Sequence, residues 1–135
     1  AIIDNNGAEN KEAMKEAILR YEEPVMFLIL KDNTELNQVN VREIADSASE
    51  LSAGKPYLLF SDARVNIDIS PDGQSAAADR NLLSLIGASA ILVSSWPKKF
   101  VANLYIRFNK TPFPLRLFTS AKEALNWLEL QKKVI

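Results

Sequence analysis

The sequence predicts an α/β domain whose mixed, mainly parallel sheet has about five strands, including an edge hairpin strand, and is covered by about four helices. Short and nearly continuous apolar runs, typical of strands buried on both faces, recur along the chain. Segments with helical apolar spacing separate these runs, and this alternation is typical of parallel strands joined by crossover helices. The 135 residues suffice for one such domain, which we place at residues 12–135 after a flexible segment at 1–11.

A β-hairpin is expected at the start of the domain. Residues 11–23 have a helix-forming composition, but their second half alternates as a strand does. With residues 14–22 as a strand, the chain turns at residues 22–24 and returns through the apolar run VMFLILKD at 25–32. A helix over residues 11–23 is the alternative.

The first helix after the hairpin is predicted over residues 40–53. Its apolar face has helical spacing and consists of Val41, Ile44, Ala45, Ala48 and Leu51. Asn40 can cap the start of this helix, with Glu43 completing a capping box, and Gly54 ends it. The apolar run PYLLFSDA at 56–63 is then predicted to be a buried strand.

A second helix is predicted over residues 71–85. Ser70, Pro71 and Asp72 combine a capping hydroxyl, a fixed φ angle and a negative charge near the positive end of the helix dipole. The run ASAILVSS at 88–95 follows as another buried strand.

A third helix is predicted to start at Pro97, with an apolar face rich in aromatic residues. A proline-rich connector leads to a strand at 115–120. Ser120 and Glu123 then form a capping box for a fourth helix. The predicted order of elements is therefore β-β-α-β-α-β-α-β-α.

The composition excludes several enzyme chemistries. The chain has no cysteine and no histidine, which removes thiolate nucleophiles, zinc–thiolate sites and Ser-His-Asp triads. Its four glycines are isolated, so they form no glycine-rich phosphate loop. We therefore expect a protein that is not an enzyme and that holds neither a metal nor a cofactor.

Charge and hydropathy narrow the expected partners and location. The formal net charge is −1, whereas nucleic-acid-binding domains are usually basic, so we expect no nucleic acid partner. The longest uninterrupted apolar run, Val25 to Leu30, has six residues, and a membrane-spanning helix needs about twenty. The first ten residues lack the basic and apolar regions of a signal peptide. A cytoplasmic location is expected by default.

Several segments resemble a known fold family. They are YEEPVMFLILKD, PYLLFSDAR, the Ile69-Ser70 start of the second helix, FVANLYIRFNK and PLRLFTSAKEALNWL. Over about residues 12–132 the chain resembles the SpoIIAA-like fold, which STAS domains (sulfate transporter and anti-sigma-factor antagonist) share with lipid-binding CRAL-TRIO modules. Within it, the chain is most similar to small bacterial STAS-like proteins of unknown role.

Ser70 is the residue to which this resemblance draws attention. Anti-sigma-factor antagonists carry a phosphorylatable serine at the start of the second helix, in an Asp-Ser-Ser/Thr-Gly pattern. The resemblance therefore implies that Ser70 is a phosphoacceptor or a partner contact, although this chain has Pro71 after the serine and no Asp-Ser pair. The alternative is a plain N-cap serine, worth about 1 kcal/mol.

A rim of polar residues is predicted where parallel strands end, because ligands of α/β proteins gather there. The rim combines residues that follow two successive strands: Asp62, Arg64, Asn66, Asp68, Ser94, Ser95 and Trp96. Arg64 could grip an anion, and Trp96 could offer an apolar platform. Ordinary capping, with Trp96 packed on the third helix, is the alternative.

Two functions follow from these features. The first is a non-enzymatic, cytoplasmic interaction and regulatory module of the STAS type, which binds a protein partner or a second copy of itself as a homodimer. The second is a carrier of a small molecule or lipid, related to the CRAL-TRIO fold. The carrier predicts an apolar cavity between the sheet and the third helix, near Trp96, Phe100 and Leu104.

Overall fold

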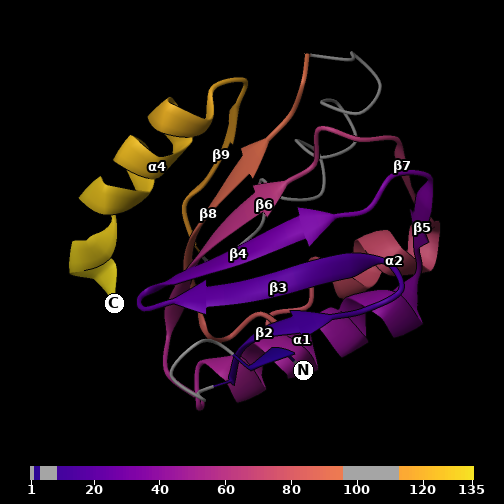
Figure 1. Cartoon of the computed structure of the whole chain (residues 1–135), viewed down its shortest axis with the longest axis horizontal. Helices are drawn as coiled ribbons and strands as arrows, with labels where there is room; N and C mark the ends of the chain where they lie inside the picture. Colours follow the sequence, from indigo (N-terminus) through magenta and orange to yellow (C-terminus); the bar gives the residue numbers. More distant parts are fainter. Residues whose placement is uncertain (1, 4–8, 96–112) are drawn as a thin grey trace.

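The computed structural model describes the chain except for residues 1, 4–8 and 96–112. Its centre is a sheet with the order β1-β2-β3-β4-β6-β8-β9 (Figure 1). The strands are β1 (Ile2–Ile3), β2 (Glu9–Ala13), β3 (Ala17–Glu22), β4 (Val25–Leu30), β6 (Tyr57–Asp62), β8 (Ile86–Leu92) and β9 (Leu115–Phe118). The first four strands are antiparallel, and β4, β6, β8 and β9 are parallel. The prediction of a mixed, mainly parallel sheet is confirmed.

The hairpin is confirmed, and the alternative helix over residues 11–23 is wrong. Strands β3 and β4 pair from Ala17 opposite Leu30 to Glu22 opposite Val25. The sequence did not indicate the two strands outside this hairpin, so the sheet has seven strands rather than about five. Lys11, in the segment expected to be flexible, pairs with Arg20 of β3. The flexibility of residues 1–11 stays a prediction.

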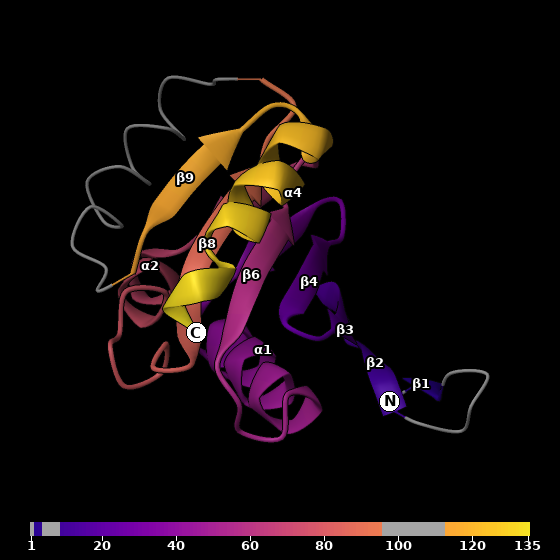
Figure 2. The same ribbon diagram turned by 90° about the vertical axis from the view of Figure 1, so that its left-hand side faces the viewer.

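Among the described residues, helices cover both faces of the sheet (Figure 2). Helix α1 (Gln38–Leu51) and helix α2 (Pro71–Ala76) lie on one side, and helix α4 (Ala121–Leu130) lies on the opposite side. Strand β6 shows how the two faces divide. Its residues Leu58 and Phe60 pack in the α4-side core, whereas Tyr57 belongs to the core on the α1 side. Apolar residues at consecutive strand positions thus supply both cores.

Helix α1 starts earlier than predicted, and its cap is a different residue. Asn37 is the N-cap, and its Oδ1 accepts a hydrogen bond from the amide of Asn40 at 3.0 Å. The Asn40 Oδ1 accepts in return from the amide of Asn37 at 2.9 Å. Asn40 therefore closes the capping box from inside the helix instead of starting it, and Glu43 is not its partner. Ser52 caps the far end, and Gly54 follows with a φ of 75°.

Helix α2 ends at Ala76, nine residues short of the predicted end at residue 85. The Asp79 side chain explains the early end. Its Oδ1 accepts hydrogen bonds from the amides of Asn81 at 2.9 Å and Leu82 at 3.3 Å. Such local bonds offer the backbone an alternative to the helix. The apolar residues at 82, 83 and 85 follow helical spacing but lie in turns.

The last predicted helix is confirmed as α4. The Ser120 hydroxyl accepts a hydrogen bond from the amide of Glu123 at 3.3 Å, which caps the helix. Ala124 and Leu128 are its buried residues. Trp127 is half-buried and lies against Phe118, with ring centroids 5.7 Å apart. The predicted third helix from Pro97 lies outside the described residues, in which the α-helices are α1, α2 and α4.

Candidate functional site

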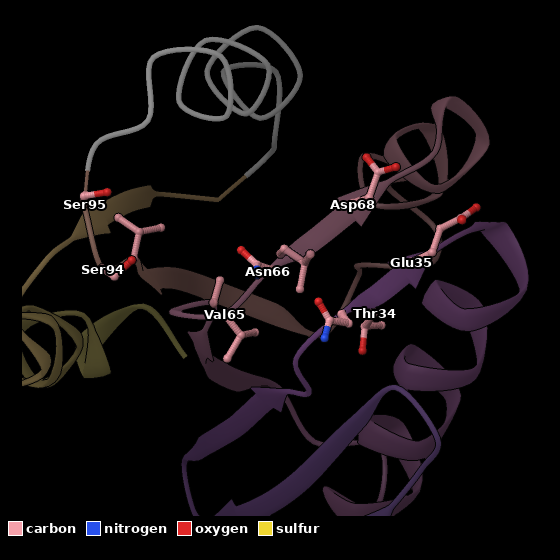
Figure 3. Close-up of a pocket in the computed structure, with 11 residues that line it drawn as sticks. Thr34, Glu35, Val65, Asn66, Asp68, Ser94 and Ser95 are labelled. Carbon is pink, nitrogen blue, oxygen red and sulfur yellow. The ribbon is translucent and has the colours of Figure 1, made fainter.

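A polar cleft of about 610 Å³ lies where β6 and β8 end (Figure 3). Its far wall is a small two-stranded parallel ribbon of β5 (Thr34–Leu36) and β7 (Ile67–Ile69). The cleft is lined by Asn33, Thr34, Glu35, Ala63, Val65, Asn66, Ile67, Asp68, Val93, Ser94 and Ser95. The cleft therefore occupies the edge at which the sequence predicts a ligand rim.

The β5–β7 ribbon was not predicted, and it positions half of the cleft. Thr34 lies opposite Ile67, and Glu35 lies opposite Asp68. The Asp32 Oδ1 accepts a hydrogen bond from the amide of Asn66 at 2.9 Å. This bond holds the segment after β6 against the segment after β4, 34 residues away in sequence. With three residues in each strand, the ribbon is too short for a periodic sequence signal.

Six polar side chains of the cleft are available to a ligand. Within the described part of the chain, none of them makes a hydrogen bond or ion pair with another residue: Thr34, Glu35, Asn66, Asp68, Ser94 and Ser95. Four of the six were predicted from the sequence as rim residues. Thr34 and Glu35 were missed, because the ribbon that places them there was missed. The cleft thus offers hydroxyl, amide and carboxylate groups to a binding partner.

The cleft also contains two like charges side by side. Glu35 and Asp68 are direct neighbours across the ribbon, both are exposed, and they project from the same face because aligned residues do so. Like charges directly opposite each other destabilise a sheet. The fold therefore carries a small electrostatic cost at the cleft.

We expect the substitution Asp68→Asn to raise the free energy of unfolding by about 0.2–1 kcal/mol, because it removes this repulsion. Urea denaturation of the variant and the wild type at pH 7 measures the change. Asp46→Asn on the exposed side of α1 is the matched control and should have a smaller effect. A loss of stability in Asp68→Asn would show that the two carboxylates do not repel each other.

Asp62 and Arg64 do not line the cleft; they bind each other instead. The Arg64 Nε donates to Asp62 Oδ1 at 3.0 Å, and its Nη2 donates to Oδ2 at 2.8 Å. This bond from the Arg64 side chain lowers the pKa of the Asp62 carboxyl. The guanidinium fork that was expected to grip an anion is therefore already occupied by a carboxylate.

The Asp62–Arg64 pair makes stability depend on pH. Because the folded pKa of Asp62 is lowered, its carboxylate stabilises the fold above the unfolded pKa, about 3.9, and this stabilisation disappears as the pH falls through the folded pKa. We expect Asp62→Asn to be less stable than the wild type at pH 7, with the difference shrinking below about pH 4. Urea denaturation across this range measures it. A difference that stays constant with pH would contradict the role of the charge.

Ser70 is the N-cap of α2, as predicted from the sequence. Its hydroxyl accepts a hydrogen bond from the amide of Gly73 at 3.1 Å, and it lies within donating distance of the Leu36 carbonyl oxygen at 3.2 Å and of Asp72 Oδ1. The hydrogen bond from Ser70 lowers the pKa of the exposed Asp72 carboxyl. Ser70 does not line the cleft, and its role as phosphoacceptor or partner contact stays a prediction.

Trp96, the last residue of the predicted rim, lies outside the described residues. The basic and aromatic positions of the predicted third helix share this status, including Phe100 and Leu104. The cavity that the sequence predicts beside that helix therefore stays a prediction.

A second, apolar cavity of about 150 Å³ lies between the sheet and α1. Side chains of β3, β4, β6 and β8 form one wall, and Val41, Ile44 and Ala48 of α1 form another. Ala63 and Ile67 line both this cavity and the polar cleft, so the two spaces adjoin. This cavity lies against α1, so it is not the one that the sequence predicts near Trp96, Phe100 and Leu104.

The described residues form no helix long and apolar enough to cross a membrane. They also contain no cluster of three or more acidic side chains arranged to hold a metal ion.

The fold defines the class of protein. The structure is similar to that of an uncharacterised protein of the DUF3478 family from Shewanella loihica PV-4, which has a SpoIIAA-like fold. The two share 17% sequence identity with a TM-score of 0.56, over 83% of this chain and 91% of that one. The chain thus has a SpoIIAA-like α/β fold, which confirms the fold that the sequence resemblance predicts.

The sequence places the chain within a family. It belongs to the family described as "Domain of unknown function (DUF7793)", whose model matches residues 19–132. The match begins inside β3 and ends after α4, so it spans the sheet from the hairpin to the last helix. No curated protein matches the chain.

Proposed function

We propose that this protein is a non-enzymatic, cytoplasmic interaction and regulatory module of the STAS type, which binds a segment of a protein partner in the polar cleft. The observation that carries the proposal is the set of six unengaged polar side chains lining a cleft of about 610 Å³. Concave sites with a few convergent polar groups are the usual binding sites.

The charge of the cleft indicates what the partner segment offers. Glu35 and Asp68 can only accept hydrogen bonds when ionised, and Arg64 is bound to Asp62. A partner segment with a lysine or arginine side chain would relieve the repulsion between the two carboxylates and gain charge-assisted hydrogen bonds. We therefore propose a basic segment, rather than the anion expected from Arg64.

Affinity capture with matched variants tests the proposal. Wild type, Glu35→Lys and Glu43→Lys are used as baits in an extract of the source organism. Both variants make the same charge reversal on an exposed residue, but Glu43 lies on α1 outside the cleft. We expect a partner on wild type and Glu43→Lys that is lost on Glu35→Lys. The same proteins on all three baits would contradict binding in the cleft.

The regulatory part of the proposal concerns Ser70. The hydroxyl lies at the start of α2 and within reach of β5, the strand that carries Glu35 into the cleft. A phosphate at Ser70 would end its bond to the Leu36 carbonyl and place negative charge beside Asp72. The partner from the capture experiment is then measured against Ser70→Glu and Ser70→Ala. Release by the glutamate alone supports a switch, whereas equal binding to all three proteins leaves Ser70 a cap.

Self-association is the remaining form of the proposed interaction. A homodimer would bury surface on two copies of the same face. Sedimentation of the purified chain over a range of concentrations decides whether a second copy is a partner.

A carrier of a small molecule is the second candidate function, and the apolar cavity favours it. Protein interiors are close-packed, with few voids larger than a water molecule, so a cavity of about 150 Å³ is uncommon. Mass spectrometry of the native protein for a bound small molecule tests this function directly.

A further inference from the structure

The walls of the apolar cavity contain two polar positions at its centre. Strands β6 and β8 lie side by side, and their residues that line the cavity are apolar apart from Tyr57, Ser61 and Ser89. Ser89 lies opposite Leu59, and Ser61 lies two residues further along β6, so the two serines are diagonal neighbours. Each serine interrupts a wall otherwise made mostly of leucine, isoleucine and alanine.

Both serines are buried and line the cavity. Ser61 is 8% exposed and Ser89 is 3% exposed. Neither hydroxyl makes a hydrogen bond within the described part of the chain. Neither is among the fully enclosed side-chain atoms that lack a partner, which are Glu16 Oε1 and Tyr21 OH, so both hydroxyls are accessible from the cavity. The two hydroxyls thus point to a ligand with its own hydrogen-bonding group.

The volume of the cavity limits the size of that ligand. A space of about 150 Å³ accommodates a single six-membered ring. A long acyl chain is larger than this space.

We propose that the apolar cavity binds a small amphipathic molecule, with one ring or an equally short hydrocarbon body and one hydroxyl-type group that hydrogen-bonds to Ser61 and Ser89. The hydrocarbon body would contact the aliphatic wall, including Leu28, Ile44 and Ile91. This inference rests on the carrier function proposed above and names the class of its ligand. It does not depend on the partner proposed for the polar cleft.

The proposal predicts that the ligand enters the cavity from the adjoining cleft. Ala63 and Ile67 line both spaces, and Ser61 lies two residues before Ala63 on the same chain segment. A ligand that enters between β7 and the end of β6 meets Ile67 first and the serine hydroxyls next. Ile67→Trp should therefore slow association and dissociation by a similar factor, which changes the exchange rate more than the affinity.

Phenol and benzene are suitable probes, because they differ by one hydroxyl group. Their binding to the full chain is measured by titration calorimetry and by chemical-shift changes of the amides of β6 and β8. We expect wild type to bind phenol more tightly than benzene. Ser61→Ala and Ser89→Ala should each weaken phenol binding about two- to tenfold and leave benzene binding unchanged. Ser75→Ala on the exposed side of α2, outside both the cleft and the cavity, is the control that should change neither.

A filled cavity provides the second test. Ala48 lines the cavity from α1 and is 3% exposed, so Ala48→Leu should abolish the binding of both probes while the chain remains folded. If this variant does not fold, wild type and the two serine variants still decide the question. Equal binding of phenol and benzene, unchanged by the serine substitutions, would overturn the ligand class but leave an apolar carrier. If neither probe binds to wild type, both the proposed ligand class and the carrier function are overturned.

Discussion

Replacing Leu58 with alanine is expected to lower the free energy of unfolding by about 2–5 kcal/mol. Leu58 lies in β6 near the middle of the sheet, is fully buried, and belongs to the core on the α4 side. The substitution removes the contacts of three heavy atoms and leaves a cavity that the close-packed surroundings fill only in part. The loss is large because strands on both sides and α4 above hold the walls of this cavity apart.

Urea denaturation followed by circular dichroism measures the effect of Leu58→Ala. Leu130→Ala is the matched control, because it makes the same change at the end of α4, where the side chain is 69% exposed. It should cost far less. A loss below about 1 kcal/mol in Leu58→Ala would mean that the α4-side core collapses around the missing atoms.

Replacing Gly73 with alanine is expected to have the second-largest effect, about 1–3 kcal/mol, and to act on the binding cleft. Gly73 is buried in α2 beside β5, and a Cβ atom added there would lie 2.4 Å from the Leu36 carbonyl oxygen and 3.1 Å from the Asn37 Cα. Both contacts are with backbone, so a change of rotamer cannot relieve them. Helix α2 must move away from the β5–β7 ribbon.

Gly73→Ala should loosen the β5–β7 ribbon in addition to lowering the free energy of unfolding. The same Leu36 carbonyl accepts hydrogen bonds from the amide and hydroxyl of Ser70, so its displacement also loosens the cap of α2. We expect faster amide hydrogen exchange in residues 34–36 and 67–69, together with loss of the partner that Glu35→Lys also releases. Ser75→Ala, on the exposed side of α2, is the control. Unchanged exchange in the ribbon would show that the helix can shift without disturbing the cleft.

Leu58→Ala and Gly73→Ala act on opposite sides of the sheet. The α4 side of the sheet contributes packing, and Leu58 tests it without a cleft residue being touched. The α1 side contributes packing as well, but it also contains the apolar cavity and adjoins the polar cleft. A variant that loses binding while the α4-side core remains stable would therefore show that binding depends on the α1 side of the sheet.

Much of the fold could be predicted from local signals in the sequence. Continuous apolar runs predicted the strands β4, β6 and β8, since strands buried on both faces require apolar residues at consecutive positions. Alternating residues predicted β3. The cap residues Ser70 and Ser120 were predicted correctly, because an N-cap depends on contacts within four residues. The cis Glu23–Pro24 peptide bond lies in the turn that proline led us to expect.

The errors share one cause, which is competition from a nearby side chain or a distant strand. Helix α2 stops early because Asp79 binds the amides that follow it, although the apolar spacing continues to residue 85. Asn40 has the sequence of a cap, but Asn37 lies before it with the same side chain and takes that place. The periodicity of apolar residues does not show which side chain will bind the backbone amides at a helix end.

The candidate site depends on tertiary structure more than any other feature of this protein does. The sequence by itself determined that Asn66, Asp68, Ser94 and Ser95 follow strands, and parallel strands bring their ends to one edge. Only the folded chain showed that Arg64 is occupied by Asp62, that Glu35 joins Asp68, and that two buried serines face an apolar space. The last two facts depend on pairing between residues about 30 positions apart, which local sequence patterns do not encode. The local sequence pattern therefore determines which positions of each strand are buried. The charge and the volume of the site depend on which strands become neighbours in the folded chain.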